Sequence, residues 1–240
     1  MREADEKLLK AAREGDADAI LTLVQRGADV DARGNLGDTP LSIAVERWDE
    51  SVASLLVELG ADPNLSPGGR TLLLKYVDFL SCCLPPRRDA AGDEQHLSVR
   101  RRTLERIELL VELGTEMDAE ASSGRKSALK LAVEERLADV AAVLLAAGAS
   151  AEGCFAANLF ENEDEMGGFL AEVLENLSKR HADGLLDVKA ALRLSELLCR
   201  HVRGYPKAEK ALENFRFETE VVPAATASDE AGYESDIPMM

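Results

Sequence analysis

Apolar residues recur along the chain at the spacing of short amphipathic helices. Between residues 50 and 59, Val52, Leu55 and Leu56 lie at positions i, i+3 and i+4, which places them on one face of a helix. Gly60 follows this segment, and glycine adopts the left-handed conformation that ends a helix at the lowest cost. The pattern therefore predicts a short helix with one buried face that ends at Gly60.

The same pairing of a leucine-rich segment with a glycine occurs four times. The glycines are Gly27, Gly60, Gly114 and Gly148. The first and last intervals between them are nearly equal, whereas the middle interval is much longer. We therefore expect a structural repeat with a period of about 33 residues and an insertion of about 21 residues in its third copy.

A second motif keeps a fixed phase with these glycines. The T-P-L sequence at 39–41 precedes Gly60 by the same interval as the S-A-L sequence at 127–129 precedes Gly148. The hydroxyl of Thr39 can cap a helix, and Pro40 suits the first helical position, where its missing N–H needs no partner. Each repeat is therefore expected to contain two helices, the first opened by this motif and the second ended by the glycine.

Two motifs in fixed phase at this period resemble the ankyrin repeat family, and the best copy spans residues 37 to 64. The resemblance implies an all-α fold: an ankyrin-repeat solenoid of stacked helix-turn-helix units with short hairpin loops. The usual histidine of the T-P-L-H motif is replaced here by Ser42. The usual glycine between the two helices is kept as Gly15, and the residues that replace it in later copies are Trp48, Leu80 and Arg136.

The repeats are expected to occupy residues 1–150, as ankyrin repeats 1 to 4. The insertion falls at about 82–102, between the two helices of the third repeat. Pro85 and Pro86 should end the first of these helices, because proline cannot continue one. The second is expected from 104 to 113.

Beyond residue 150 the pattern fades. Residues 151–217 are predicted to form a degenerate repeat and a C-terminal helical cap, in which the H-A-D sequence at 181–183 takes the place of G-A-D. The helices expected there cover 155–160, 169–183, 185–202 and 206–215. Residues 218–240 contain six acids and no base, and are predicted to be an acidic disordered tail.

The charge of the chain excludes several classes of partner. Its formal net charge is −17 and its pI is about 4.6, which argues against a nucleic-acid binder and against polybasic attachment to a membrane. No apolar run approaches the ~20 residues of a spanning helix, and residues 1–7 lack the apolar core of a signal peptide. We expect a cytoplasmic protein, or a nuclear one, that is a monomer on its own.

No catalytic, cofactor-binding or metal-binding constellation is predicted. The three histidines do not lie near a recognisable catalytic motif, and no glycine-rich phosphate loop is present. The acidic run at 161–165 lacks the spacing of a calcium loop. The four cysteines match no metal-binding spacing, so they are interpreted as reduced structural or loop thiols, with a metal or redox site as the alternative. These cysteines are Cys82, Cys83, Cys154 and Cys199.

The resemblance also implies a binding surface, because ankyrin repeats bind proteins through hairpin tips and inner helices along a concave groove. The residues at the corresponding positions of this chain are Arg13, Glu14, Arg33, Asn35, Leu36, Asp38, Glu46, Arg47, Trp48, Arg70, Asp78, Lys126, Glu134 and Glu135. The alternative for each of them is an ordinary solvated side chain. Trp48 has two interpretations: it anchors a partner, or it packs over the third repeat and closes its edge.

The insertion is basic although the chain is acidic. Its arginines are Arg87, Arg88, Arg100, Arg101 and Arg102. They could bind an acidic partner, a phosphate or the acidic tail of the same chain, or form a solvated loop.

Together these features predict a non-enzymatic adaptor or scaffold that binds a protein partner of unknown identity through the concave ankyrin groove. Two alternatives remain open. The chain could be a permanent structural subunit of a large assembly, or a regulatory inhibitor that masks a basic surface of its partner with the acidic tail.

Overall fold

The computed structural model describes residues 2–65, 71–83, 94–118, 126–155, 159–160 and 162–221, with the backbone alone at 82–83, 96 and 217–221. The part of the chain that it describes contains α-helices and no strand, so the expected all-α fold class is confirmed. The chain divides into two compact units, Met1–Ala156 and Ala157–Met240.

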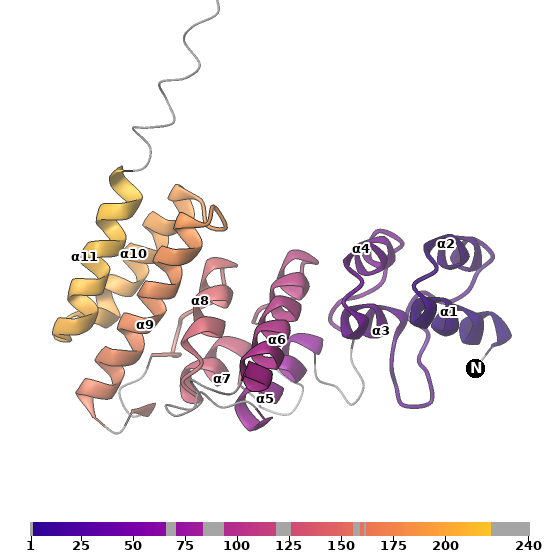
Figure 1. Cartoon of the computed structure of the whole chain (residues 1–240), viewed down its shortest axis with the longest axis horizontal. Coiled ribbons are helices and arrows are strands. Elements are labelled where there is room, and N and C mark those ends of the chain that lie inside the picture. The colour runs from indigo at the N-terminus through magenta and orange to yellow at the C-terminus, as the bar shows by residue number, and fades with distance from the viewer. Residues whose placement is uncertain are drawn as a thin grey trace, which may run out of the picture. The chain divides into compact units, whose positions relative to one another are not determined.

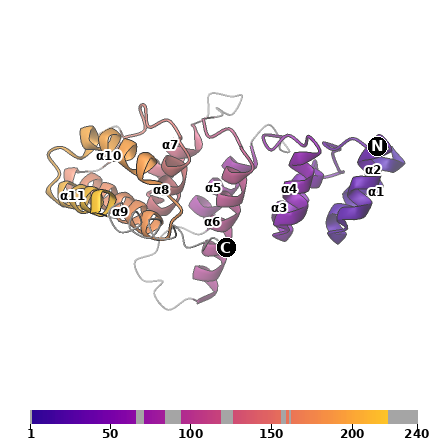
Figure 2. The same ribbon diagram turned by 90° about the horizontal axis from the view of Figure 1, so that it is seen from above.

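The first unit is a stack of four helix pairs (Figures 1 and 2). The pairs are α1 (Glu3–Glu14) with α2 (Ala17–Gln25), α3 (Pro40–Arg47) with α4 (Glu50–Glu58), α5 (Leu72–Cys83) with α6 (Glu94–Glu112), and α7 (Ala128–Glu134) with α8 (Ala138–Ala146). Successive pairs pack on each other, as α1 does on α3 and α5 on α7. Each pair buries leucine, isoleucine or valine side chains between its helices, and stacking covers the rest of the apolar surface.

Local signals set the ends of these helices. The Thr39 hydroxyl accepts a hydrogen bond from the Ser42 N–H, and the Ser42 hydroxyl accepts one from the Thr39 N–H, which closes a capping box at the start of α3. At the other end of each pair stands a glycine with a positive φ, where a side chain would be strained. These are Gly27, Gly60, Gly114 and Gly148, with φ of 87°, 96°, 79° and 95°.

Consecutive loops of the stack are joined by a repeated hydrogen bond. A side-chain oxygen of one loop accepts the backbone N–H of the residue that follows the G-A or G-T pair of the next. The bonds run from Asp62 N to Asp31 Oδ1 at 3.1 Å, from Glu116 N to Asn64 Oδ1 at 2.9 Å, and from Ser150 N to Asp118 Oδ1 at 3.0 Å. The insertion therefore leaves this contact between the second and third repeats in place.

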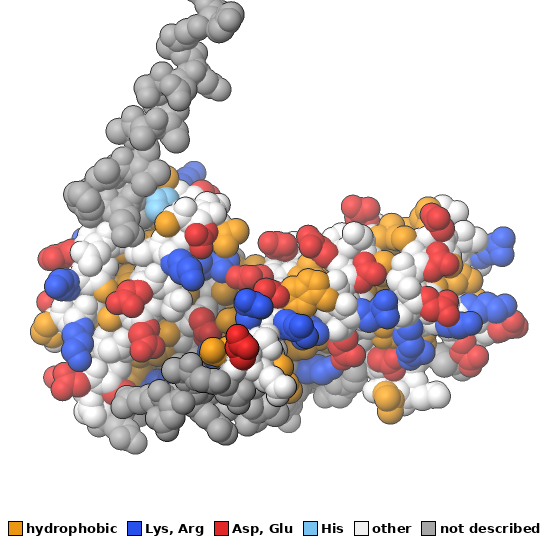
Figure 3. Space-filling model, viewed as in Figure 1, with side chains coloured by type: hydrophobic (Ala, Val, Ile, Leu, Met, Phe, Trp, Pro, Cys, Tyr) orange, Lys and Arg blue, Asp and Glu red, His pale blue; other side chains and the backbone are white. Residues whose placement is uncertain are grey.

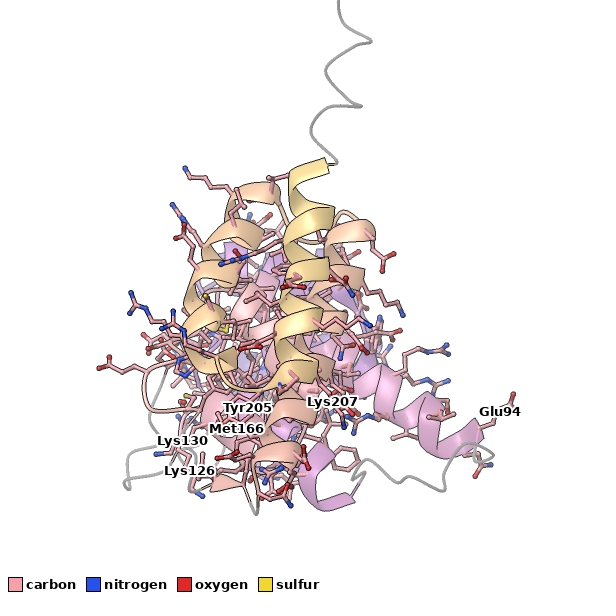
Figure 4. All side chains as sticks on the ribbon, turned by 90° about the vertical axis from the view of Figure 1, so that its left-hand side faces the viewer. Glu94, Lys126, Lys130, Met166, Tyr205 and Lys207 are labelled. Atoms are coloured by element: carbon pink, nitrogen blue, oxygen red, sulfur yellow. The ribbon has the colours of Figure 1, made fainter. Side chains whose placement is uncertain are left out.

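The second unit is built from α9 (Glu163–Ala182), α10 (Val188–Val202) and α11 (Pro206–Val221). Figure 1 shows α9 and α11 running in the same direction and α10 in the opposite one. Buried side chains such as Leu174, Leu198 and Phe215 fill the space between them. At one end Gly167 lets α9 approach Tyr205, since an added Cβ would lie 3.1 Å from the Tyr205 Cβ. Figure 4 shows Tyr205 near Met166, with Lys207 to their right.

The structure corrects the expected helix boundaries in the third repeat. The second helix begins at Glu94 instead of 104, so helix covers the second half of the expected insertion. The added turns of α6 are attached to α8, because Arg100 forms an ion pair with Asp139 of that helix. Leu80 is not a turn residue either: it lies fully buried inside α5. Pro85 and Pro86 lie outside the described residues.

The second unit also departs from the expected boundaries. The glycine that ends α9 is Gly184, with φ of 75°, and not the H-A-D sequence at 181–183. The described residues between 155 and 160 form no α-helix, and 156–158 lie outside the description. Helix α11 continues to Val221, past the predicted start of the tail at 218. The rest of that predicted tail, 222–240, is outside the described residues.

Candidate protein-binding surface

The loop between α2 and α3 presents a leucine to solvent. Its tip is closed by two backbone hydrogen bonds, from Gly34 N to Asp38 O at 2.8 Å and from Gly37 N to Gly34 O at 2.9 Å. A side chain at residue 34 would displace the Asp38 carboxylate, because an added Cβ would lie 2.4 Å from the Asp38 Oδ1. Leu36 stands at this tip with 89% of its surface exposed. Figure 1 shows the loop projecting from the helices, and Figure 3 shows apolar atoms at its end.

Hollows lie on both sides of this loop. The larger, of about 620 Å³, extends over the inner helices and is lined by Arg13, Leu36, Asp38, Ser42, Ile43, Glu46, Arg47 and Lys75. The other, of about 500 Å³, lies against α1 and is lined by Glu6, Leu9, Arg13, Gly34, Asn35, Leu36 and Asp38. Leu36 belongs to both linings, so a partner seated in either hollow would touch it.

Two ion pairs join neighbouring repeats across the larger hollow. The Arg13 Nη2 lies 2.6 Å from the Asp38 Oδ2, and the Lys75 Nζ lies 2.6 Å from the Glu46 Oε1. Both pairs are partly exposed, so each contributes at most about 1 kcal/mol to stability. Their main effect is to set charges of both signs around an apolar floor. Figure 3 shows the same mixture of blue and red side chains over the face of α1 to α4.

Trp48 lies beside this hollow and is not part of its lining. It occupies the turn between α3 and α4 with a left-handed φ of 65°, the conformation that Gly15 has in the first repeat. The guanidinium carbon of Arg106, from α6, lies 5.5 Å from the centre of the Trp48 ring and 5.8 Å from that of Tyr76. Trp48 thus packs against the third repeat and still keeps 37% of its surface exposed.

Arg106 also closes the end of α3. Its Nη2 donates to the Glu46 carbonyl at 2.9 Å and its Nε to the Val45 carbonyl at 3.3 Å. A cation suits this position, because the last carbonyls of a helix carry a partial negative charge. Beside it the Tyr76 hydroxyl is buried and has no hydrogen-bond partner within the described residues. Burial and the nearby Glu46 carboxylate raise the pKa of Tyr76 well above its ordinary value, so the phenol stays neutral.

The described arginines of the insertion have separate surroundings. Arg100 Nη2 lies 2.7 and 2.8 Å from the two carboxylate oxygens of Asp139, and only 14% of its side chain is exposed. Arg101 is 74% exposed and lies 3.9 Å from Glu105 of its own helix. Arg102 is exposed, and the structure describes no hydrogen bond or ion pair for it. Arg87 and Arg88 lie outside the described residues.

The remaining predicted positions lie elsewhere. Lys126 pairs with Glu134 in the fourth repeat, Arg70 lies outside the described residues, and the others are separate surface positions: Glu14, Arg33, Asp78 and Glu135. Sequence reasoning missed Ser42, Ile43 and Lys75 in the hollow. Lys75 could have been found, since it follows Thr71 by four residues as Ile43 follows Thr39.

Metal binding, thiol chemistry and membrane insertion have little support in the described residues. No group of three His, Cys, Asp or Glu side chains there is placed to hold a metal ion. Cys154 is buried, and burial raises the pKa of its thiol, which lowers its reactivity. No helix in the described ranges is both long enough and apolar enough to cross a membrane.

Comparison with known proteins identifies one segment of the first unit. Residues 36–66, which include Leu36 and the pair α3–α4, match the Ankyrin repeat family. Ankyrin repeats are typically non-enzymatic, and they indicate a protein–protein interaction module. The match covers one of the four helix pairs.

Three relatives share parts of the chain. A mitochondrial disaggregase of Bos taurus is 43% identical over 61 residues, which is 25% of this chain and 9% of the relative. The oxysterol-binding protein-related protein 1 of Homo sapiens is 42% identical over 66 residues, 27% of this chain and 7% of the relative. A putative ankyrin repeat protein of Rickettsia felis is 50% identical over 40 residues, 17% of this chain and 64% of the relative.

The first two relatives are far longer than the segment they share, so the similarity concerns the repeat and not the whole of either protein. The helix pairs, their phased glycines and the match at 36–66 agree with one another. The chain contains an ankyrin repeat, and its resemblance to ankyrin repeat proteins is confirmed.

Proposed function

We propose that the first unit is a non-enzymatic adaptor module that binds a partner protein at the hollows around Leu36. One observation carries the proposal: a leucine with 89% of its surface exposed is fixed at the tip of a hydrogen-bonded loop, between two hollows. A scattered surface leucine needs no explanation, but this one is held where a partner would bury it. A few residues near the centre of an interface, where water is excluded, supply most of its binding energy.

The surroundings of Leu36 suit an interface with an apolar centre and a polar rim. Ile43 is part of the floor, while Arg13, Asp38, Glu46 and Lys75 supply charges at the edge. These four charges pair with one another, so apart from Arg47 the charges lining the larger hollow balance. The partner is therefore expected to bind chiefly through apolar contact, with a modest dependence on salt.

The proposal places the protein in the cytoplasm or the nucleus, as a scaffold without a cofactor. The proposal uses only the repeat that the chain shares with the disaggregase and the oxysterol-binding protein, and no activity or partner of either, because the chain covers less than a tenth of each relative. Partner identity has to come from the binding surface itself.

The test compares two matched leucine variants. Three tagged 240-residue chains are used to capture proteins from extracts of the source cells: the wild type, Leu36→Asp and Leu185→Asp. The captured proteins are identified by mass spectrometry. Leu185 is also an exposed leucine, at 60%, in the second unit. We expect a protein that the wild type and Leu185→Asp both retain and Leu36→Asp loses. The same capture by all three chains, or by none, contradicts the proposal.

A further inference from the structure

We propose that the chain carries a second binding surface, formed by Trp48, Val99, Arg102 and Arg106, which takes an acidic segment of a partner protein that includes an apolar side chain. We call these four residues the Trp48 surface. None of them lines the hollows around Leu36, so the inference does not rest on the proposed function.

The length of α6 creates this surface. Helix α6 has 19 residues, whereas the other second helices of the stack, α2, α4 and α8, have 9 each. Its extra turns carry side chains that the other repeats lack. Val99, Arg102 and Arg106 lie at i, i+3 and i+7 and therefore share one face of α6. Arg106 stacks on Trp48, so this face begins at the indole ring and continues toward the start of α6 through Arg102 and Val99.

Arg102 is the cation on this face that remains for a partner. Of the three adjacent arginines, Arg100 is committed to Asp139 and Arg101 lies near Glu105 on another side of the helix. Arg106 is committed to the carbonyls of α3. Arg102 is exposed and, in the described part of the chain, has no ion pair or hydrogen bond. It lies one helical turn from Arg106, so a carboxylate there would meet a locally positive surface on an acidic chain.

Apolar surface lies on both sides of that charge. Val99 is 39% exposed and Trp48 is 37% exposed. Trp48 is held in a left-handed conformation that is unfavourable for a residue with a side chain and that Gly15 adopts freely in the first repeat. Stacking on Arg106 fixes the indole in place. The indole, 37% exposed, is stacked on Arg106, one helical turn from Arg102, which has no partner among the described residues. This arrangement suits a segment with an apolar residue next to glutamate or aspartate.

The occupant is acidic protein and not nucleic acid or a second copy of the chain. A nucleic acid would need a broad basic face, and the net charge of −17 opposes both a polyanion and another copy of this chain. A single carboxylate beside Arg102 requires only the local charge, since distant charges are screened at physiological ionic strength.

The test uses a fluorescein-labelled peptide in which one phenylalanine lies between two glutamates and all other residues are uncharged, titrated into the full chain. Fluorescein anisotropy measures binding, and Trp48, the only tryptophan, reports on the site through its own emission. We expect saturable binding that shifts the Trp48 emission. Arg102→Glu should weaken it about tenfold, because it replaces a charge-assisted contact with repulsion.

Arg101→Glu is the matched control, since it makes the same charge change one residue away on another side of α6. Arg101→Glu should change the affinity for the peptide less than about twofold. Leu36→Asp should leave the affinity for the peptide unchanged. Arg102→Ala repeats the test without the added acid, and helical circular dichroism checks the fold of each variant. Absence of saturable binding, equal losses in the two Arg→Glu variants, an unchanged Trp48 emission, or equal binding of a single-stranded oligonucleotide overturns the proposal.

Discussion

The two compact units build a helical core by different means. In Met1–Ala156 every helix except α6 is short, and each helix pair ends at a glycine with a positive φ and is tied to the next loop by a side-chain oxygen. In the described residues of Ala157–Met240, three helices of 20, 15 and 16 residues pack along their lengths. The first unit therefore repeats one turn and loop geometry around its buried core, whereas the second unit depends mainly on packing between long helices. Substitutions of buried side chains and of glycines should therefore affect the stability of the two units differently.

The largest expected effect comes from the packing of the second unit. Phe215 is fully buried between α11 and its neighbours, so Phe215→Ala should destabilise this unit by about 3–5 kcal/mol. Urea unfolding followed by circular dichroism should show that loss. The transition of Trp48 fluorescence, which reports on the first unit, should stay in place. Leu192→Ala, at a position 39% exposed, is the control and should cost less than about 1 kcal/mol. A shift of the Trp48 transition with Phe215→Ala would show that the units unfold together.

A pair of glycine substitutions should have opposite signs in the two units. Gly60 has φ of 96° and open space around it, so Gly60→Ala should cost about 1–2 kcal/mol through backbone strain alone. Gly168 lies inside α9, also with open space, so Gly168→Ala should add about 0.5–1 kcal/mol through helix propensity. Thermal unfolding of both variants checks this. A loss of stability in Gly168→Ala would contradict the contrast.

The smallest effect concerns a side-chain link in the first repeat. The Asp29 backbone N donates to the Asp5 Oδ1 at 3.1 Å. This hydrogen bond and the nearby Arg2 lower the pKa of Asp5, and burial opposes them. A carboxyl whose native pKa is lowered stabilises the fold above its unfolded pKa of about 4, and that contribution is lost as the pH falls through the lower native value.

Asp5→Asn should therefore be less stable than the wild type at pH 7, with the difference closing in acid. Urea titrations followed by Trp48 fluorescence at pH 7 and near pH 3 measure both values. A difference that stays constant between these pH values would show that ionisation of Asp5 contributes nothing.

The contrast between the units also separates what the sequence predicts well from what it misses. The capping box at Thr39 and the positive-φ glycines are local signals, visible within a few residues, and the structure has them where they were expected. The early start of α6 was missed because it depends on Arg100 and Asp139, which are 39 residues apart. Read alone, three adjacent arginines favour a solvated loop.

In the second unit the fixed period was misleading. A helix that packs along a bundle is not limited to the length of one repeat. Helix α9 ends at Ala182, and the positive-φ glycine that follows it is Gly184, three residues after position 181, where the repeat period places it. At the candidate site, position within the repeat selects Arg13, Leu36 and Glu46, and the structure brings these three residues to the lining of one hollow. It could not show that their charges pair with neighbouring repeats, because such pairs depend on how the repeats stack.

The measurement that tests the central claim most directly is the affinity of the captured partner for the wild type, Leu36→Asp and Leu185→Asp chains. If Leu36 anchors the interface, its loss should cost about 2 kcal/mol or more, which is a rise in Kd of about thirtyfold. Leu185→Asp should leave Kd within a factor of about two. Equal affinities for all three chains, with the fold intact by circular dichroism, would contradict a binding surface at Leu36.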